Sequence, residues 1–219
     1  MTDIKRLYDA RFNTIERVRK NELWAILCQN FLVQFINPTD TVVDLGAGYC
    51  EFINNIRAKR RIAVDIKSDV KESAQAGVEI VVGSTKNIRR LFQPNSIDII
   101  FISNLLEHLE SKEEVFRLLY ESYGILRKGG RLLIMQPDIS LVGHEYWDFF
   151  DHKVPLTTAS LQEVLVSIGY SIHYLRSPFL PYTTKTKYLP TWPWLFKLYL
   201  KIGALHYLFG KQFFVCAQK

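Results

Sequence analysis

The chain has 219 residues, of which 48% are hydrophobic, with 11 glycines and 8 prolines, so it can bury a core and is not a disordered sequence. Its three cysteines, Cys28, Cys50 and Cys216, are scattered without a C-x-x-C pair, which argues against a disulfide framework and a zinc site. The net charge of +6 allows nucleic acid, anionic lipid or an acidic substrate as partner and does not choose among them.

The first residues of the chain, Met1 to Arg6, carry charges but no apolar core of the kind found in signal peptides. No run of eighteen uncharged apolar residues occurs that could span a membrane. We therefore expect a cytoplasmic protein, in a reducing compartment.

Residues 1–38 are expected to form a helical extension before the first strand. Apolar positions from Leu23 to Leu32 predict an amphipathic helix, which Asn37-Pro38 ends. The basic residues of this segment are interpreted as a solvated face: Arg11, Arg17, Arg19 and Lys20. An alternative is that Tyr8 and Arg11 fold over a ligand as a lid.

Strands alternate with helices from residue 40 to residue 176, which predicts a parallel sheet with helices on both faces. Strands are expected at 42–45, 62–65, 78–82, 97–102, 131–135 and 170–175, and a last strand at 212–217. Helices are expected from the glycine turn through Ile56, from Lys112 to Leu126 with Lys128-Gly-Gly130 as the stop, and from Thr157 or Thr158 to Ser167, with Gly169 as the stop.

A glycine turn between the first two strands is the strongest functional signal. Gly46 and Gly48 let the backbone approach a ligand closely, because no Cβ intervenes and a positive φ costs little. Asp65 ends the second strand about twenty residues beyond the turn, where a carboxylate can bind both hydroxyls of a ribose. The sequence therefore predicts a nucleoside-binding site. The third small residue of a dinucleotide fingerprint is replaced by Glu51, which would repel a diphosphate and favours a cofactor without phosphates.

The pattern D-x-G-x-G, followed by an acid after the next strand, resembles the class I S-adenosylmethionine-dependent methyltransferases. The resemblance implies an α/β fold with a Rossmann-like, seven-stranded, mostly parallel sheet and an antiparallel last strand. It also implies that Asp44 and the turn at Gly46, Ala47 and Gly48 hold the methionine part of the cofactor, and that Asp65 holds the ribose. Many members of that family have a third glycine where this chain has Cys50.

Further cofactor contacts are expected at the carboxyl ends of the other strands, where open parallel sheets bind ligands. Ile66 follows Asp65, and Ser84 and Thr85 follow the third strand, where the resembling family commonly places an acid. In this chain a hydroxyl or a backbone group must make the contact that the acid makes in that family. Asn104 follows the fourth strand, where relatives place backbone near the methionine part.

The run Ser103-Asn-Leu-Leu-Glu-His-Leu109 is similar to the N-x-L-E-H-L run of small-molecule methyltransferases. Glu107 and His108 could polarise a substrate hydroxyl, which makes His108 a candidate general base. The alternative is that this pair fixes the loop or packs against the following helix.

The segment from Gly143 to Thr157 concentrates aromatic residues, acids and two histidines between the fifth strand and its helix. Long loops at this end of a parallel sheet usually carry function. Tyr146, Trp147 and Asp151 are therefore expected to bind the acceptor, and His152 is the first candidate general base. In the alternative, Trp147 and its neighbours Phe149 and Phe150 seal the edge of the core while Asp151 pairs with His152.

Residues 177–210 form an insert between the last two strands that is rich in aromatic residues and lysine. A helix is predicted from Trp192 to Phe209, with one apolar face made of Leu195, Leu198, Tyr199, Ile202 and Leu205. We expect this helix to cover the sheet edge and the acceptor side of the site. The alternative is a weak peripheral contact with a membrane or a protein.

The pattern as a whole resembles bacterial methyltransferases of sugar and polysaccharide biosynthesis. It implies a single methyltransferase domain over 1–219, with a core of 39–176 and 211–219. The implied reaction moves a methyl group from S-adenosylmethionine to an oxygen, or less favourably a nitrogen, of a small glycosyl or lipid-linked acceptor, leaving S-adenosylhomocysteine. No metal is expected, because no H-x-x-H pair or acid cluster has ligand spacing.

Two other interpretations stay open. A nucleic-acid methyltransferase would fit the positive charge, although no Asn-Pro-Pro-Tyr type motif follows the fourth strand, so stable nucleic-acid binding is not expected. A scaffold that binds the cofactor without catalysis is the second. The oligomeric state is not predicted.

Overall fold

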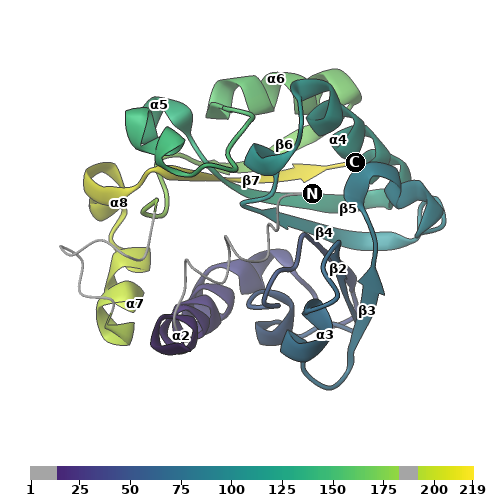
Figure 1. Cartoon of the computed structure of the whole chain (residues 1–219), viewed down its shortest axis with the longest axis horizontal. Helices are drawn as coiled ribbons and strands as arrows, with labels where there is room; N and C mark the ends of the chain where they lie inside the picture. Colours follow the sequence, from purple (N-terminus) through teal and green to yellow (C-terminus); the bar gives the residue numbers. More distant parts are fainter. Residues whose placement is uncertain (1–13, 183–191) are drawn as a thin grey trace.

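The computed structural model describes residues 14–182 and 192–219 and has a seven-stranded sheet at its centre (Figure 1). The strand order is β3-β2-β1-β4-β5-β7-β6, and β7 runs antiparallel to both of its neighbours. The strands are β1 Thr41–Leu45, β2 Arg60–Asp65, β3 Val78–Val82, β4 Ile97–Ser103, β5 Leu126–Pro137, β6 Ser171–Arg176 and β7 Gln212–Gln218. The expected Rossmann-like fold with an antiparallel last strand is therefore confirmed.

The α-helices in the described ranges are α2 Thr14–Asn30, α3 Val70–Ser73, α4 Lys112–Ile125, α5 Ile139–Val142, α6 Thr158–Ile168, α7 Pro193–Lys201 and α8 Gly203–Phe209. Short 3-10 helices are η1 Leu32–Phe35, η2 Ile53–Asn55, η3 Thr85–Arg90, η4 Leu106–His108 and η5 Gly143–Asp148. Helices α2 and α7 lie together on one face of the sheet, and α4 and α6 cover the other (Figure 1).

Successive side chains along the strands point to opposite faces of the sheet and pack in two separate hydrophobic clusters. Val42 of β1 packs in the cluster on the α2 face, whereas its neighbour Val43 packs in the cluster on the α4 face. Both residues are fully buried, as expected for a parallel sheet covered on both sides.

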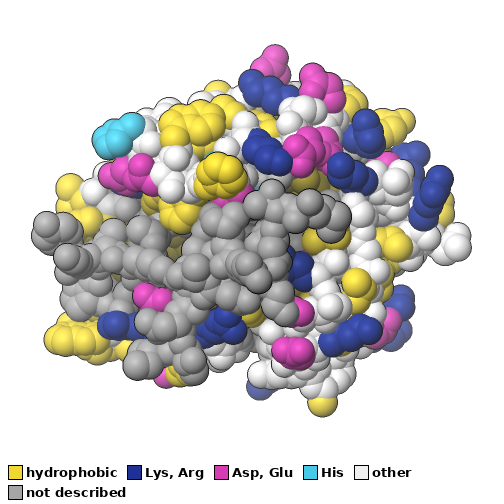
Figure 2. Space-filling model, viewed as in Figure 1, with side chains coloured by type: hydrophobic (Ala, Val, Ile, Leu, Met, Phe, Trp, Pro, Cys, Tyr) yellow, Lys and Arg dark blue, Asp and Glu magenta, His cyan; other side chains and the backbone are white. Residues whose placement is uncertain are grey.

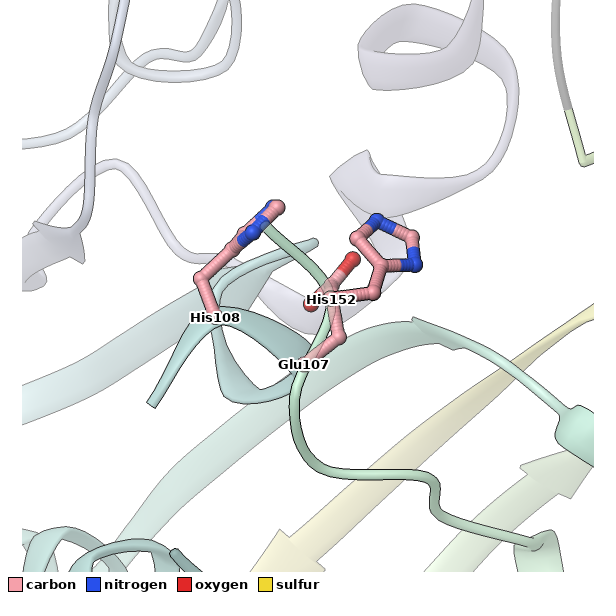
Figure 3. Close-up of side chains that lie close together, drawn as sticks. All are labelled: Glu107, His108 and His152. Atoms are coloured by element: carbon pink, nitrogen blue, oxygen red, sulfur yellow. The ribbon is translucent and has the colours of Figure 1, made fainter. Parts of the chain in front are cut away.

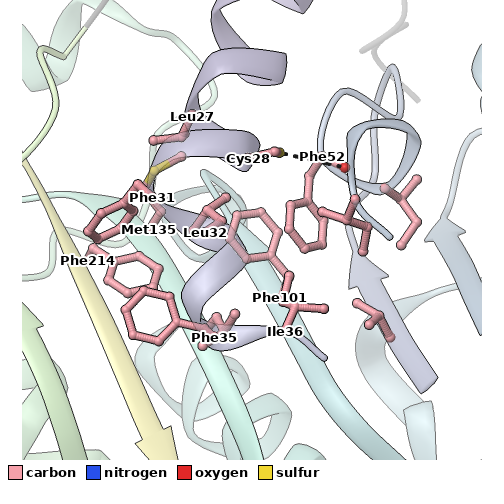
Figure 4. Packing of buried hydrophobic residues seen from close by; sticks show 14 of the residues in the cluster. Leu27, Cys28, Phe31, Leu32, Phe35, Ile36, Phe52, Phe101, Met135 and Phe214 are labelled. Carbon is pink, nitrogen blue, oxygen red and sulfur yellow. Dashed lines mark hydrogen bonds between the residues drawn. The ribbon is translucent and has the colours of Figure 1, made fainter. Parts of the chain in front are cut away.

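The N-terminal helix is part of the core on its face of the sheet (Figure 4). The ring of Phe31 lies 5.0 Å from that of Phe214 on β7, and Phe52 stacks on Phe101 of β4 with ring centroids 3.8 Å apart. The Cys28 thiol donates a 3.9 Å hydrogen bond to the Phe52 carbonyl oxygen, which ties α2 to the segment after the glycine turn. What the sequence suggested as an extension therefore helps to position that segment.

Helix α6 confirms the sequence signals that predicted it. The Thr157 hydroxyl accepts a hydrogen bond from the Ser160 amide, and the Ser160 hydroxyl accepts one from the Thr157 amide, forming a capping box. Gly169 ends the helix with φ +114°, a backbone conformation that favours glycine.

The prediction of a helix after the glycine turn is wrong. Only the single 3-10 turn η2 forms, because Gly46, Gly48 and Cys50 all have positive φ and keep the chain out of the right-handed helical region. The Asn54 side chain then donates to the Ser73 carbonyl oxygen and accepts from the Gln75 amide. These hydrogen bonds hold the segment in an irregular path.

The boundary between α4 and β5 also differs from the expectation. The helix ends at Ile125, and Leu126 already pairs with Ile97 in the sheet. The next pair joins Ile99 to Arg131, so Lys128-Gly-Gly130 lies inside β5, where the pairing register shifts. Gly129 has φ +77°, which explains why a glycine stands within a strand there.

Residues 192–210, the described end of the insert, form two helices where one was predicted, because the chain is extended at Ile202 between α7 and α8. Tyr199 and Leu200 form the buried side of α7, which contacts α2, whereas Leu198 and Ile202 are about 40% exposed. The face of α7 that is actually buried is therefore rotated about the helix axis relative to the predicted apolar face. Among the described helices, none combines the length and the hydropathy that crossing a bilayer requires.

Candidate active site

The candidate site residues lie at the carboxyl ends of the parallel strands. Strand β1 has β2 on one side and β4 on the other, so the chain reverses its direction of progress across the sheet at β1. Ligands of open parallel sheets bind at such a switch point. The insert returns to the same edge, because β6 ends and β7 begins beside the end of β5.

The glycine turn after β1 has the geometry that the sequence predicted. The amides of Gly46 and Ala47 both donate to the Val64 carbonyl oxygen, at 2.9 and 3.1 Å. A Cβ at Gly46, where φ is +75°, would come within 2.9 Å of the Leu105 side chain. At Gly48, with φ +53°, it would meet only the Gly46 oxygen, at 4.0 Å, among the described atoms. Gly46 therefore permits close packing, and Gly48 leaves backbone accessible to a ligand.

Asp65 at the end of β2 is tied to this turn through its carboxylate. One oxygen accepts a 2.8 Å hydrogen bond from the Gly48 amide, and the other accepts a 2.9 Å bond from the Lys67 amide. Each carboxylate oxygen has a second acceptor site, so the group can still receive hydroxyl donors. The orientation of Asp65 is thus fixed by backbone before any ligand binds.

Asp44 at the end of β1 is almost completely buried, on the α2 face. Burial, and then the nearby carboxylates of Glu51 and Asp65, raise the pKa of Asp44 well above its usual range. The ionised form is therefore unfavourable until a positive charge arrives.

Two basic residues of α2 contact the glycine turn, although Arg17 and Arg19 are exposed as the interpretation of a solvated face predicted. The Arg17 guanidinium lies 4.3 Å from the Tyr49 ring centroid and donates to the Tyr49 hydroxyl at 2.8 Å. Lys20 forms a 2.9 Å ion pair with Glu51. Tyr8 and Arg11, the suggested lid residues, lie outside the described residues.

The remaining predicted cofactor residues surround the same edge. Ile66 follows Asp65 directly and is 71% exposed. The Ser84 hydroxyl accepts a hydrogen bond from the backbone amide of Lys86 and so caps η3, which begins at Thr85. Asn104 has φ +46°, and its amide donates to the Met135 carbonyl oxygen.

A second group of residues lies past the ends of β4 and β5. Glu107 is 1% exposed, and its carboxylate accepts a 2.6 Å hydrogen bond from the Gln136 side chain. Burial raises the pKa of Glu107, although His108 and Gln136 act against that effect. The Glu107 carbonyl oxygen also accepts the amides of Lys153 and Val154. Glu107 therefore joins the loop after β4 to the loop before α6.

His108 pairs with Asp151 of the second loop. Its Nδ1 lies 3.1 Å from the Asp151 carbonyl oxygen and 3.2 Å from the carboxylate Oδ2. Burial acts to lower the pKa of His108, but the hydrogen bond to Asp151 and the charges of Glu107 and Asp151 outweigh it and raise the pKa. The carboxylate of Asp151 is thus directed toward His108, whereas the alternative interpretation paired it with His152.

His152 lies beside His108, with 4.9 Å between the ring centroids (Figure 3). Phe149 stacks on the imidazole at 5.0 Å, and Tyr146 approaches it at 4.7 Å. The Tyr182 hydroxyl is 3.4 Å from Nδ1 of His152. Sequence reasoning missed Tyr182, because it belongs to the insert and no local motif marks it.

The aromatic residues of the loop have different roles from those first considered. Tyr146 is fully buried and donates its hydroxyl to the Val154 carbonyl oxygen at 2.6 Å, so it supports His152 and does not present a polar group to an acceptor. Trp147 and Phe150 are 55% and 82% exposed, so these two do not seal the core edge.

The fold also gathers a group that sequence spacing did not reveal. Glu107, His108 and His152 each offer one metal-ligand atom, and these atoms lie within 4.8 Å of one another. The sequence argument against a metal considered only residues close together in the chain. Here two neighbours meet a third residue that lies far along the chain.

Comparison with known proteins gives a consistent picture. Residues 43–134 match the model of a methyltransferase domain. No curated protein sequence matches the chain. A solved structure of an S-adenosylmethionine-dependent methyltransferase from Archaeoglobus fulgidus is 21% identical, with 99% of this chain and 100% of that chain aligned and a TM-score of 0.67.

Two other similar structures carry different names. A possible histamine N-methyltransferase from Thermotoga maritima is 18% identical, with 95% of this chain and 96% of that one aligned and a TM-score of 0.66. The [4+2]-cyclase SpnF is 13% identical, with 91% and 80% aligned and a TM-score of 0.60. At such identities the likeness concerns the fold, and the reaction has to be argued from the site.

Proposed function

We propose that this chain, an S-adenosylmethionine-dependent methyltransferase of class I, methylates an oxygen of a small glycosyl or lipid-linked acceptor. The observation that carries the acceptor proposal is the cluster of His108, Asp151 and His152 beside the cofactor edge. An imidazole that can accept a proton suits a hydroxyl acceptor, whose own pKa lies far above 7. The exposed rings of Trp147 and Phe150 suit the apolar face of a sugar.

The cofactor residues follow from the geometry of the β1 and β2 ends. Asp44 would receive the ammonium group of the methionine part, and its burial makes that charge pairing favourable. The Gly46–Gly48 turn would lie along the same part, and Asp65 would accept the ribose hydroxyls. Ile66, Ser84, Thr85 and Asn104 stay proposed cofactor contacts.

The reaction needs little from the protein beyond alignment and proton removal. The acceptor oxygen attacks the methyl carbon, the carbon–sulfur bond breaks, and its electron pair returns to sulfur, which becomes the neutral thioether of S-adenosylhomocysteine. The acceptor proton leaves in the same process. Holding oxygen, carbon and sulfur in line supplies most of the acceleration.

His152 is the proposed first acceptor of that proton, and His108 the second candidate. Phe149 and Tyr182 hold the His152 ring, and Asp151 holds the His108 ring. The test is a screen of nucleotide sugars and glycolipids with radiolabelled cofactor, followed by the His152→Ala variant on any acceptor found. Transfer only to amines would contradict the oxygen acceptor.

The exposed surface of the insert helices is compatible with a lipid-linked acceptor. Trp194, Leu198, Tyr207 and Leu208 are between 41% and 79% exposed, and Lys197 is also exposed. Such a surface supports weak, reversible binding to anionic membranes. Cosedimentation with phosphatidylglycerol vesicles should therefore be slight and be lost at high salt. Strong, salt-resistant binding would contradict the weak contact proposed here.

The nucleic-acid alternative gains little from the surface. On the face shown in Figure 2, described Lys and Arg side chains are interspersed with Asp and Glu. Binding of RNA or DNA with a steep salt dependence would support that alternative. The scaffold alternative would be supported by cofactor binding without turnover of any acceptor class.

The insert at 177–210 and the extension at 1–38 are proposed parts of one domain with the core of 39–176 and 211–219. Contacts between α7 and α2, and the buried Phe179, support this organisation. The three described cysteines are free and buried, which suits the proposed cytoplasmic location.

A further inference from the structure

The side chains of Glu107, His108 and His152 converge beside the acceptor region (Figure 3). Glu107 and His108 come from η4 after β4, and His152 comes from the loop that precedes α6. One donor atom from each lies within 4.8 Å of the other two. The set is two imidazoles and one carboxylate.

Two of the three side chains, Glu107 and His108, are oriented by neighbours in the way that metal ligands commonly are. Gln136 donates to one carboxylate oxygen of Glu107, and Asp151 accepts from Nδ1 of His108. With Nδ1 as donor, a neutral His108 carries its lone pair on Nε2. Partners of this kind fix the tautomer and the ring orientation of ligand histidines.

The burial of this group also favours a cation. Glu107 is 1% exposed and His152 is 9% exposed. Buried charges in proteins are paired or coordinate metals. The Oε1 atom of Gln136 is buried and has no hydrogen-bond partner within the described part of the chain. A water bound to an ion beside Glu107 could satisfy it.

We propose that Glu107, His108 and His152 bind one first-row divalent cation, with Zn²⁺ as the best match. Imidazole ligands favour zinc and its neighbours over Mg²⁺ and Ca²⁺, which prefer oxygen. Three protein ligands of this type leave a coordination position for water or substrate. The cluster, whose ligand atoms lie within 4.8 Å of one another, needs to contract by up to about 1.4 Å, because donors about 2.1 Å from a tetrahedral ion lie about 3.4 Å apart.

The use of the ion in catalysis rests on the proposed methyl transfer, whereas its binding does not. An acceptor hydroxyl that takes the open position would lose its proton to solvent more easily, since the ion stabilises the alkoxide. His152 would then act as a ligand and not as the base. The methyl group and the sulfur electron pair move as before.

The test uses the full chain, stripped with EDTA and then titrated separately with Zn²⁺, Mn²⁺ and Mg²⁺ by calorimetry, with bound metal counted by mass spectrometry. We expect one Zn²⁺ per chain, weaker Mn²⁺ binding and no Mg²⁺ binding. Glu107→Gln and His152→Ala should each lose more than about 100-fold in Zn²⁺ affinity, since even outer partners of metal ligands contribute about 10–100-fold. The Asp151→Asn variant should lose about 10–100-fold in Zn²⁺ affinity, because Asp151 is an outer partner of His108.

His144→Ala is the matched control, because His144 is an exposed histidine of the same loop. It should keep the wild-type Zn²⁺ affinity, and all variants should keep their affinity for S-adenosylmethionine, which reports on folding. Absence of Zn²⁺ binding to the wild type, equal binding by Glu107→Gln, or tighter binding of Mg²⁺ than Zn²⁺ would overturn the site. If Zn²⁺ binds with the expected variant pattern but no hydroxyl acceptor is methylated, the metal site stands and the proposed function fails. Full transfer by the stripped protein would overturn the catalytic use of the ion.

Discussion

The proposed cofactor end and the proposed acceptor end of this molecule are built by different means. At the cofactor end, the Gly48 amide and the Asp65 carboxylate that bind each other are 17 residues apart in the chain. At the acceptor end, His108 meets Asp151 across 43 residues, and Tyr182 meets His152 across 30. The first is organised by one strand–turn–strand segment and its backbone. The second is organised by side chains from separate loops and the insert.

This difference separates binding from turnover. The turn at Gly46 and Gly48 acts through backbone geometry, so its contribution depends on φ and on the space around the turn. In the proposed mechanism, the acceptor region acts through the protonation and orientation of the His108 and His152 imidazoles. Changes at one end should therefore leave the other end largely intact, because sites without shared partners contribute nearly additively.

The largest expected effect is on turnover in the His152→Ala variant. Loss of a general base, or of the proposed metal ligand, should lower the rate of methyl transfer by about 10²–10⁴-fold. Affinity for S-adenosylmethionine, measured by calorimetry, should stay within about threefold of wild type, because the cofactor residues are elsewhere. Unchanged turnover in a well-folded variant would leave His108 as the candidate base, and a large loss of cofactor affinity would break the separation of the two ends.

The Asp65→Ala variant should weaken the cofactor by about 10- to 100-fold, since hydrogen bonds to charged groups contribute about 1.5–3 kcal/mol. S-adenosylhomocysteine should weaken equally, because both ligands carry the same ribose. NAD should bind neither protein. Glu72→Ala, an exposed acid on α3, is the matched control and should behave as wild type. Comparable binding of NAD would contradict the cofactor assignment at this end.

The Asp44→Asn variant should have opposite effects on stability and on binding. Because burial raises the pKa of Asp44 in the folded protein, its ionisation costs stability as pH rises above the carboxyl's ordinary value. The asparagine side chain of the variant cannot ionise, so this loss of stability disappears. The melting temperature at pH 7.5 should therefore rise, by about 2–4 °C for each kcal/mol gained in a chain of this size. The same variant should bind S-adenosylmethionine more weakly.

Melting curves between pH 5 and 8, with and without cofactor, measure both effects. The wild-type protein should lose stability relative to the variant as pH rises through this range. A melting temperature that falls in Asp44→Asn at every pH would show that the carboxylate stabilises the fold without a ligand.

The smallest expected effect concerns the contact of α2 with the glycine turn. Lys20→Ala removes a partly exposed ion pair with Glu51, and such pairs contribute about 0.2–1 kcal/mol. Cofactor affinity should change by less than about fivefold, and the difference should shrink at high salt. Arg19→Ala on the same helix is the control. A larger, salt-independent loss would mean that α2 binds the cofactor directly.

Local signals in the sequence predicted most of the fold. The seven strands, the cap and stop of α6 and the glycine turn follow from periodicity, hydroxyl caps and glycine positions that act over a few residues. The errors occur where tertiary contacts override such signals. After the turn, positive φ at Cys50 and the hydrogen bonds of Asn54 prevent the expected helix. In α7, packing against α2 selects a face that Leu198 does not share.

The sequence by itself determined the sheet, the glycine turn after β1 and the acid at the end of β2, because each depends on the order of neighbouring residues and on backbone conformations that few residue types permit. The tertiary structure decided which imidazole pairs with Asp151, that Tyr182 reaches His152, and that Glu107, His108 and His152 meet. The physical reason is that side-chain pairing across loops depends on how those loops cross the carboxyl edge of the sheet. No spacing along the chain records that crossing.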